Sequence, residues 1–266
     1  MIIGMYDSGI GGLTVAKEVL NQIPTANIIY IADNFNVPYG DKEGSLIRSF
    51  SCEISNYLIS QDVDTICIAC NMSTAVSLET IKEMHRDKQV YGTIEFGAKD
   101  ALKYSEKIGV LATTGTVNSG AYTRFITNLN SNACVIEEAC PEFVPLVEGG
   151  KTDTPKAEEA VKKHIENVIN KCDIGALILG CTHYPYLTGL IKKYLPERVE
   201  IINPAVSMAR FLKEENVYNN DKLSFECYAT KDMEGVSLAC EKVLNLSVKC
   251  KPLYWNDGVL KMQNKL

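Results

Sequence analysis

Two cysteines in this chain each follow an apolar run that is typical of a buried strand. Cys70 comes directly after residues 66–69, and Cys181 follows a similar run and precedes Thr182 and His183. A thiol serves in proteins as a nucleophile, a metal ligand, a redox partner or a proton-transfer group, so the residue type alone decides nothing. Two thiols at matching positions in separate parts of the chain indicate one mechanism that uses both.

Metal binding and redox chemistry fit this pattern poorly. A structural zinc ion needs about four ligands, and Cys67 with Cys70 has the spacing of one ligand pair, but no second pair follows and the chain has only 3 histidines. A redox Cys-x-x-Cys motif normally lies at the start of a helix. Cys67 instead lies inside the apolar run, and we expect it to point into the sheet. We therefore predict no metal and no redox site.

Acyl transfer by a cysteine and a histidine is one enzymatic interpretation. Cys181 and His183 are two residues apart, and either Asn71 or Glu148 could orient the histidine as a base. This interpretation leaves Cys70 without a role.

Inversion of an amino acid at its α-carbon uses both thiols. One thiolate removes the α-proton from one face, and the thiol on the other face delivers a proton, so the configuration inverts. Each thiol then needs a polar neighbour, because a thiol buried alone keeps its proton and stays inert. Asp7 is available for Cys70, and His183 with Glu148 is available for Cys181.

Strand-like and helix-like segments alternate along the chain, which predicts parallel sheets covered by helices. The alternation starts with residues 2–6, a glycine loop and a helix from residue 13, and it starts again at residue 107. We predict an α/β fold of two similar parallel-sheet domains that face each other across an active-site cleft. The first domain comprises residues 1–94 and 207–266, and the second comprises residues 95–206.

The loops beyond the carboxyl ends of the predicted strands gather polar groups, and ligands of open parallel sheets bind there. The residues that occupy these ends are Asp7, Ser8, Pro38, Tyr39, Gly40, Cys70, Asn71, Thr113, Thr116, Cys181, Thr182 and His183.

The composition narrows the class of partner. The net charge is −6, the pI is about 5.3, and the basic residues form no long run, which argues against a nucleic-acid surface. No apolar run approaches the roughly 18 residues of a membrane span, and the N-terminus does not have the pattern of a signal sequence. We predict a cytoplasmic protein with a small-molecule substrate and with no nucleic-acid or membrane partner.

The remaining cysteines and histidines are interpreted as ordinary packing or surface residues. Without an export signal, the 10 cysteines predict reduced thiols rather than disulfides. His85 and His164 lie on charged helical segments, and we expect them at the surface. Cys140 is interpreted as a packing residue. The cysteines without informative sequence neighbours are interpreted as small core or surface residues, and they are Cys52, Cys134, Cys172, Cys227, Cys240 and Cys250.

The motifs together resemble those of the cofactor-independent glutamate racemases of the aspartate/glutamate racemase superfamily. The matching segments occur in the family's order over most of the chain. They are YDSGIGGLTV (residues 6–15), VPYG (37–40), ACN (69–71), the spaced residues Thr113, Thr116 and Ser119 followed by Tyr122, CPEFVPLVEGG (140–150) and GCTHYP (180–185).

The resemblance implies an isomerase that supplies D-glutamate for peptidoglycan and needs neither pyridoxal phosphate nor metal. Its active site lies between two α/β domains, and such racemases often form homodimers. In family terms Cys70 acts on the D-isomer and Cys181 on the L-isomer, while Asp7, Glu148 and His183 assist proton transfer. The residues implied to hold the substrate are Ser8, Pro38, Tyr39, Gly40, Asn71, Thr113, Thr116 and Thr182.

The sequence departs from the family pattern at positions that bear on the substrate. Met72 follows Cys70-Asn71 where the family usually carries threonine, and residues 34–36 are Asn-Phe-Asn instead of Thr-Ala-Arg. Loss of one charge-assisted hydrogen bond costs about 1.5–3 kcal/mol. Two alternatives to glutamate racemase therefore stay open: a racemase of aspartate or another acidic amino acid, and a non-catalytic binder with the same fold.

Overall fold

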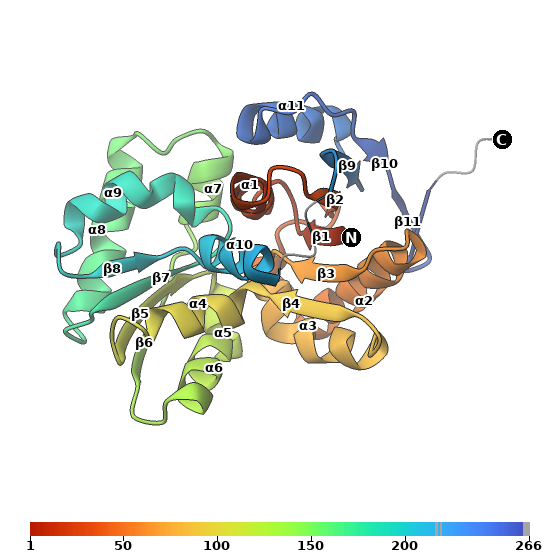
Figure 1. Cartoon of the computed structure of the whole chain (residues 1–266). Helices are drawn as coiled ribbons and strands as arrows, with labels where there is room; N and C mark the ends of the chain where they lie inside the picture. Colours follow the sequence, from red (N-terminus) through yellow and green to blue (C-terminus); the bar gives the residue numbers. More distant parts are fainter. Residues whose placement is uncertain (216–217, 219, 263–266) are drawn as a thin grey trace. The chain divides into compact units, whose positions relative to one another are not determined.

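A computed structural model describes residues 1–215, 218 and 220–262 of the chain. The chain divides into two compact units, which we call the first unit (Met1–Thr93 with Met208–Leu266) and the second unit (Ile94–Ser207). Each unit has its own parallel sheet with helices on both faces, so the predicted α/β fold with parallel sheets in two domains is confirmed (Figure 1).

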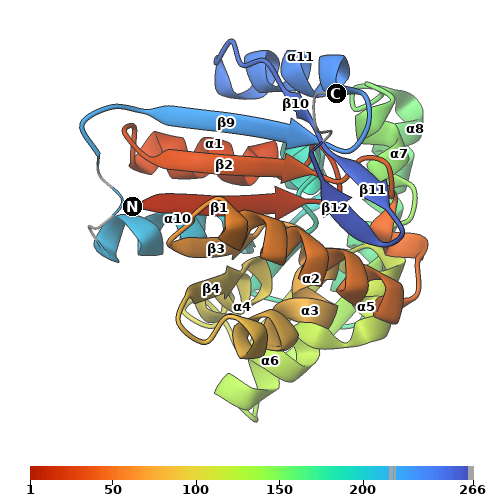
Figure 2. The ribbon, with the colours of Figure 1, turned by 90° about the vertical axis from the view of Figure 1, so that its right-hand side faces the viewer.

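The first unit is built on a six-stranded sheet in the order β10-β9-β2-β1-β3-β4, and all of its strand pairs are parallel. Figure 2 shows β9, β2 and β1 side by side with the same direction. The strands are β1 (Ile2–Asp7), β2 (Asn27–Ala32), β3 (Thr65–Ile68), β4 (Gln89–Gly92), β9 (Ser224–Ala229) and β10 (Lys251–Pro252). An antiparallel hairpin of β11 (Tyr254–Asn256) and β12 (Val259–Lys261) follows.

Helices cover both faces of this first sheet. The pair α1 and α11 lies on one side, and the pair α2 and α3 lies on the other (Figure 1). Apolar residues of α1, among them Leu13, Ala16 and Val19, are fully buried, as an amphipathic helix on a sheet requires. The helices are α1 (Leu13–Gln22), α2 (Gly44–Ser60), α3 (Asn71–Met84), α10 (Pro204–Glu215) and α11 (Met233–Leu244), with a 3₁₀ turn η1 (Tyr39–Asp41).

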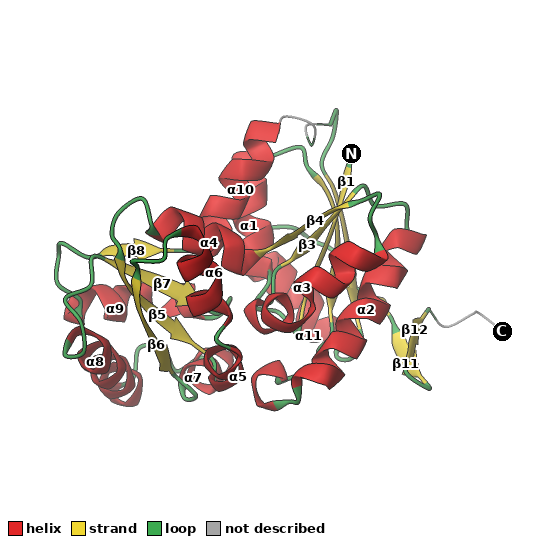
Figure 3. Ribbon diagram, turned by 90° about the horizontal axis from the view of Figure 1, so that it is seen from below, coloured by secondary structure: helices red, strands yellow, loops and turns green. Residues whose placement is uncertain are grey.

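The second unit is built on a four-stranded parallel sheet in the order β6-β5-β7-β8. Figure 3 shows α8 and α9 on one side of this sheet and α4 and α6 on the other. Its strands are β5 (Lys107–Ala112), β6 (Cys134–Ala139), β7 (Ala176–Gly180) and β8 (Glu200–Ile202). Its helices are α4 (Thr93–Ala101), α5 (Thr114–Ser119), α6 (Ala121–Leu129), α7 (Phe143–Glu148), α8 (Pro155–Ile169) and α9 (Thr188–Tyr194), with a 3₁₀ turn η2 (Tyr184–Leu187).

The two sheets share one topology. In each unit the first strand lies between the second and the third, so that β2-β1-β3-β4 and β6-β5-β7-β8 have the same order. The chain leaves the first strand in one direction and returns past it in the other, which creates a switch point between β1 and β3 and between β5 and β7. Ligands of open α/β sheets bind at the carboxyl ends of strands at such a point.

The expectation that His85 and His164 lie at the surface is wrong. His85 is only 9% exposed, and its Nε2 atom lies 3.0 Å from Ser55 Oγ. His164 is 3% exposed because it lies on the face of α8 that packs against the sheet, where Nδ1 contacts Glu138 Oε1 at 2.9 Å and Nε2 contacts Glu142 Oε2 at 3.0 Å. Charged neighbours in sequence hid the fact that both histidines belong to the buried face.

Candidate active site

Cys70 lies where the chain passes from β3 into α3, at the switch point of the first sheet. It is the N-cap of α3, and its Sγ atom accepts a hydrogen bond from the backbone N–H of Ser73 at 3.5 Å. The thiol is 6% exposed. The N–H groups and dipole of a helix N-terminus can stabilise negative charge that forms on such a sulfur atom.

Asp7 ends the strand next to Cys70. Tyr6 pairs with Ile68, and the backbone N–H of Ala69 donates to Tyr6 O at 2.9 Å, so the residues that follow on the two strands emerge at adjacent points of the sheet edge. The Asp7 side chain is 1% exposed, and its Oδ1 atom accepts a hydrogen bond from the Gly9 N–H at 3.1 Å. A buried carboxyl group beside a thiol can exchange a proton with it.

The glycine loop that contains Ser8 is folded tightly over this strand end. Tyr30 Oη donates a hydrogen bond to Gly9 O at 2.7 Å. A Cβ atom at Gly12 would lie 2.4 Å from Asp7 Cβ and 2.7 Å from Tyr30 Oη, so only glycine fits there. Ser8, 9% exposed, is held by this loop at the sheet edge.

The segment with Pro38, Tyr39 and Gly40 is anchored by Asp33, which sequence analysis did not select. Asp33 follows β2 directly and is fully buried. It accepts hydrogen bonds from Tyr39 Oη at 2.5 Å, and also from Trp255 Nε1 at 2.7 Å, Thr230 Oγ1 at 2.8 Å and Asn36 Nδ2 at 3.0 Å. Burial raises the pKa of Asp33, although these four hydrogen bonds act in the opposite direction.

Asp33 was identifiable in principle, because it follows an apolar strand in the same way as other selected residues. Pro38 itself is exposed and Gly40 is half-buried. Tyr39, between them, is buried and belongs to the same apolar cluster as Cys70. The hydrogen bond from the Tyr39 hydroxyl to Asp33 holds its ring in that cluster.

Met72 belongs to this cluster as well. The buried members are Tyr39, Ile47, Cys70 and Met72, with Phe50 and Val76 packed against them. Met72 is 6% exposed and is the second residue of α3, while Asn71, 5% exposed, is the first. The thioether thus supplies apolar packing beside the Cys70 thiol.

Cys181 lies at the switch point of the second sheet. Gly180 pairs with Ala112, so Cys181 and Thr113 leave neighbouring strands side by side. A Cβ atom at Gly180 would lie 2.8 Å from Leu111 O, so glycine is needed for the strands to approach at this point. Cys181 is 8% exposed, and its Sγ atom lies 3.8 Å from His183 Nδ1.

The other ring nitrogen of His183 faces Glu148. Nε2 lies 3.2 Å from Glu148 Oε1, a distance that suits an ion pair. Glu148 is the last residue of α7, and its side chain is 40% exposed, whereas that of His183 is 6% exposed. Thiol, imidazole and carboxylate therefore lie in a row, an order in which a proton can pass between sulfur and nitrogen.

Packing beneath this row holds α7 against η2. The rings of Phe143 and Tyr184 lie 5.0 Å apart in an edge-to-face arrangement, and Tyr184 Oη donates a hydrogen bond to Cys140 O at 3.1 Å. Cys140 is fully buried, and burial raises the pKa of its thiol. Its packing environment agrees with the interpretation made from the sequence.

Hydroxyl groups surround the second switch point. Thr113 is the N-cap of α5, and its Oγ1 atom lies 3.0 Å from Thr116 Oγ1. Thr116 is fully buried, and Thr182, directly after Cys181, is 7% exposed. Hydroxyls and backbone N–H groups of this kind can bind the carboxylates of a small substrate.

The structure therefore gathers the predicted residues in two groups. Asp7, Ser8, Cys70 and Asn71 lie at the carboxyl edge of the first sheet with the Tyr39 segment, while Thr113, Thr116, Cys181, Thr182, His183 and Glu148 lie at that of the second. Within the described ranges, no group of three or more His, Cys, Asp or Glu side chains could hold a metal ion. The described helices include none with the length and apolar character needed to cross a membrane.

Comparison with known proteins gives the chain a family. The model of the Asp/Glu/Hydantoin racemase family matches residues 17–212. The glutamate racemase of Desulforudis audaxviator (strain MP104C) is 43% identical over 210 residues, which cover 78% of this chain and 76% of that protein. The chain belongs to the Asp/Glu/Hydantoin racemase family. The resemblance read from its motifs is thereby confirmed, and with it the isomerase class.

Solved structures of family members have the same fold. The glutamate racemase isoform RacE1 of Bacillus anthracis matches with a TM-score of 0.89 and 34% identity, over 97% of this chain and 98% of that chain. The glutamate racemase of Francisella tularensis subsp. tularensis SCHU S4, solved in complex with D-glutamate, matches with a TM-score of 0.85 and 32% identity, over 93% and 95%.

Proposed function

We propose that this protein is a glutamate racemase, which interconverts L-glutamate and D-glutamate with two thiols as acid and base. The observation that carries the proposal is the repeated placement of a buried cysteine at the switch point of each sheet, Cys70 in one and Cys181 in the other. Each thiol has its own polar neighbours. The substrate follows from the relatives, which are named glutamate racemases.

The reaction needs one thiolate and one thiol in each turnover. For D-glutamate, the Cys70 thiolate removes the α-proton, and the Cys181 thiol delivers a proton to the opposite face. For L-glutamate the roles are exchanged. The proposal therefore requires both sulfur atoms to approach a single α-carbon from opposite sides.

The neighbours of each thiol set its protonation state before reaction. Asp7 takes the proton of Cys70, and the N-terminus of α3 stabilises the resulting thiolate. His183, oriented by Glu148, takes the proton of Cys181, since Nδ1 lies 3.8 Å from Sγ. All acid and base groups thus come from the protein, and we propose that no pyridoxal phosphate or metal takes part.

The substrate carboxylates are held by hydroxyl, amide and backbone N–H groups at the strand ends. We assign this role to Ser8, Tyr39, Gly40, Asn71, Thr113, Thr116 and Thr182, and Pro38, which has no N–H to donate, shapes the backbone of the segment that presents Tyr39 and Gly40. Such donors compensate the negative charge that develops when the α-proton leaves.

The product suggests the cellular role. We propose that D-glutamate from this reaction supplies peptidoglycan biosynthesis and that the protein acts in the cytoplasm, whose reductants suit a chain in which none of the ten cysteines forms a disulfide in the structure. The homodimer implied by the family resemblance remains a prediction, which sedimentation velocity of the purified protein tests.

Exchange of the α-proton in D₂O tests the two-thiol mechanism. The wild-type protein should convert L-glutamate into D-glutamate with deuterium at the α-carbon, as NMR and chiral chromatography show. Cys70→Ser and Cys181→Ser should each lower the racemisation rate by about 10³-fold or more, because serine is a poor acid and base at neutral pH. Cys52→Ser, which alters a half-buried thiol on α2, serves as the control. Racemisation that survives either active-site change would refute the mechanism.

The presence of Met72 is the reason to test aspartate as an alternative substrate. Because a thioether stands where the family usually has a hydroxyl, the same exchange experiment is run with L-aspartate. A larger kcat/KM for aspartate than for glutamate would show that aspartate is the preferred substrate. The proposed thiol mechanism would still hold. A binder without catalytic activity would show no exchange with either amino acid.

A further inference from the structure

Four of the cysteines interpreted as small core or surface residues lie in two pairs. In the second unit, Cys134 Sγ lies 3.7 Å from Cys172 Sγ. In the first unit, Cys240 Sγ lies at the same distance, 3.7 Å, from Cys227 Sγ. A disulfide bond is about 2.05 Å long, so small side-chain rotations would bring either pair to bonding distance.

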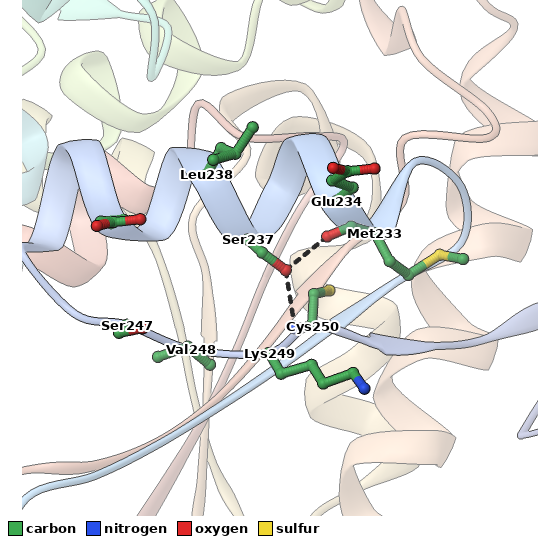
Figure 4. Close-up of a pocket in the computed structure, with 9 residues that line it drawn as sticks. Met233, Glu234, Ser237, Leu238, Ser247, Val248, Lys249 and Cys250 are labelled. Atoms are coloured by element: carbon green, nitrogen blue, oxygen red, sulfur yellow. Dashed lines mark hydrogen bonds between the residues drawn. The ribbon is translucent and has the colours of Figure 1, made fainter.

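The two pairs differ in their access to solvent. Cys134 is exposed and Cys172 is half-buried. Cys227 and Cys240 are 1% and 0% exposed, between β9 and α11. Next to them, Cys250 lines a groove of about 340 Å³ between α11 and residues 247–250, where its backbone N–H donates to Ser237 Oγ at 3.0 Å (Figure 4). A dissolved oxidant therefore reaches the pair in the second unit much more easily than the pair in the first.

The exposed pair lies at the amino-terminal ends of the strands of the second sheet. The candidate active-site residues lie at the opposite, carboxyl-terminal ends of these strands. Cys134 is the first residue of β6 and pairs with Lys107 at the start of β5. Cys172 follows α8, and its N–H donates to Val168 O at 3.2 Å, just before the chain enters β7. Cys181, at the other end of β7, belongs to the opposite edge.

We propose that Cys134 and Cys172 form a site of reversible oxidative modification, at which a peroxide converts the two thiols into a disulfide. The Cys134 thiol releases its proton, its sulfur attacks a peroxide oxygen, and the O–O bond breaks as the S–O bond of a sulfenic acid forms; for hydrogen peroxide, the hydroxide that leaves takes up the released proton and becomes one water. The sulfur of Cys172 then attacks the sulfenic sulfur, the S–S bond forms, and a second water leaves. The two thiols lose two electrons and two protons, and one peroxide is reduced to two waters.

The exposure of the two cysteines sets the order of the two steps. Cys134 is exposed and Cys172 is half-buried, so the oxidant meets Cys134 first and Cys172 then attacks the sulfenic sulfur. Burial raises the pKa of Cys172, the hydrogen bond with Cys134 adds to this, and Lys107 acts in the opposite direction, which also makes Cys172 the slower of the two thiols to react with a peroxide. A dithiol reductant restores both thiols by exchange.

The bond would close a loop that contains α7 and α8. Residues 135–171 lie between the two cysteines, and cross-linking a loop of this length restricts the unfolded chain substantially. We expect the oxidised protein to unfold at a temperature higher by roughly 5 °C or more. Because the pair is remote from Cys181, the Cys134–Cys172 bond by itself should change the racemisation rate by less than about 2-fold. The proposal of this bond does not depend on the proposed function.

Peptide mapping of the folded full-length protein tests the site. The protein is treated with one equivalent of hydrogen peroxide, its remaining thiols are alkylated, and it is digested with trypsin and glutamyl endopeptidase. Mass spectrometry should find peptides linked through Cys134 and Cys172 before any link between Cys227 and Cys240. Fragment ions distinguish Cys172 from Cys181. Prior treatment with dithiothreitol should remove the link.

Matched variants separate the disulfide from general oxidation. Cys134→Ser and Cys172→Ser should each lose the link and the rise in unfolding temperature, whereas Cys240→Ser should keep both. The proposal is overturned if the buried pair links as fast as the exposed pair. It is also overturned if Cys134 passes to sulfinic acid without a link to Cys172.

Discussion

The two switch points have the same topology but different chemical surroundings. Cys70 caps a helix of 14 residues and lies beside the end of the strand that carries Asp7. Cys181 is followed by a 3₁₀ turn of 4 residues, and its sulfur contacts the imidazole of His183 instead. A helix terminus and a carboxyl group lie beside the thiol on one side, and an imidazole with a carboxylate does so on the other. The shared topology positions the sulfur atoms, and the loops give each a different set of polar neighbours.

Substitution of the polar neighbour of either thiol should have the largest effect on kcat among the changes that test this comparison. Asp7→Asn removes the group that we propose as the base for Cys70, and His183→Asn removes the group that we propose as the base for Cys181. We expect each change to lower kcat by about 10²- to 10⁴-fold, the usual contribution of a positioned acid or base. Racemisation of both enantiomers, followed by circular dichroism, measures the loss.

Alkylation of the thiols shows whether the two partners act separately. Iodoacetamide reacts with the thiolate, and its rate at each cysteine is read by mass spectrometry. Asp7→Asn should slow alkylation of Cys70 and leave Cys181 unchanged, and His183→Asn should do the reverse. Equal slowing at both cysteines in either variant would contradict separate activation.

A second difference lies directly after the second strand of each sheet. Asp33 stands there in the first unit and accepts four hydrogen bonds, while Cys140 stands there in the second and is packed in the core. Asp33→Asn should misplace the Tyr39 ring and raise KM by about 10-fold, since one charged hydrogen bond contributes about 1.5–3 kcal/mol. Tyr39→Phe, which keeps the ring and loses the bond, is the matched control and should reproduce most of the effect. A normal KM in both variants would remove Asp33 from any role in positioning Tyr39.

The helix cover of the second sheet depends on a buried polar cluster. Glu138 accepts hydrogen bonds from Asn167 at 2.7 Å, His164 at 2.9 Å and Lys171 at 3.2 Å. Burial alone would raise the pKa of Glu138, but these hydrogen bonds outweigh it and lower the pKa.

Replacement of this carboxylate should cost stability rather than activity. Glu138→Gln should lower the free energy of unfolding at pH 7 by about 1.5–3 kcal/mol, measured by urea denaturation. Because the folded pKa is depressed, the stabilisation is present above the unfolded pKa of about 4.3 and is lost as the pH falls below it. The difference between variant and wild type should therefore shrink toward pH 3. A difference that persists there would indicate lost packing instead of lost charge.

The sequence predicts the helices and strands better than the contacts between them. The helix predicted from residue 13 begins at that residue as α1, because its apolar residues recur at helical spacing. Neither the burial of His164 nor the contact between Cys134 and Cys172 was predicted. Both depend on residues 22 to 38 positions apart that meet only when α8 packs on the sheet. Local sequence patterns predict where helices and strands lie. Which side chains meet between two elements depends on how a helix packs on the sheet, and a local pattern does not contain that information.

The same limit applied at the candidate site. The cysteines were found because each follows an apolar strand and stands in a recognisable motif. Asp33 also follows an apolar strand, but its significance comes from Thr230 and Trp255, which are about 200 residues away. Likewise α7 was not predicted as a helix, because Pro145 lies in its short span.

The smallest effect is expected at the position two residues after each thiol, where Met72 corresponds to His183. Met72 packs with Tyr39, Ile47 and Cys70 in a buried cluster, so its role is apolar packing, whereas His183 contacts its thiol directly. Met72→Thr restores the residue usual in the family. It removes buried apolar volume and adds a hydroxyl, two changes that oppose each other in substrate binding. We expect KM for glutamate to change by less than about 5-fold, with kcat nearly unchanged. Met72→Leu, which keeps the packing without the hydroxyl, is the control. If the threonine variant instead gains 10-fold or more in kcat/KM for glutamate and loses activity toward aspartate, Met72 selects the substrate, and the two positions are both functional rather than one functional and one structural.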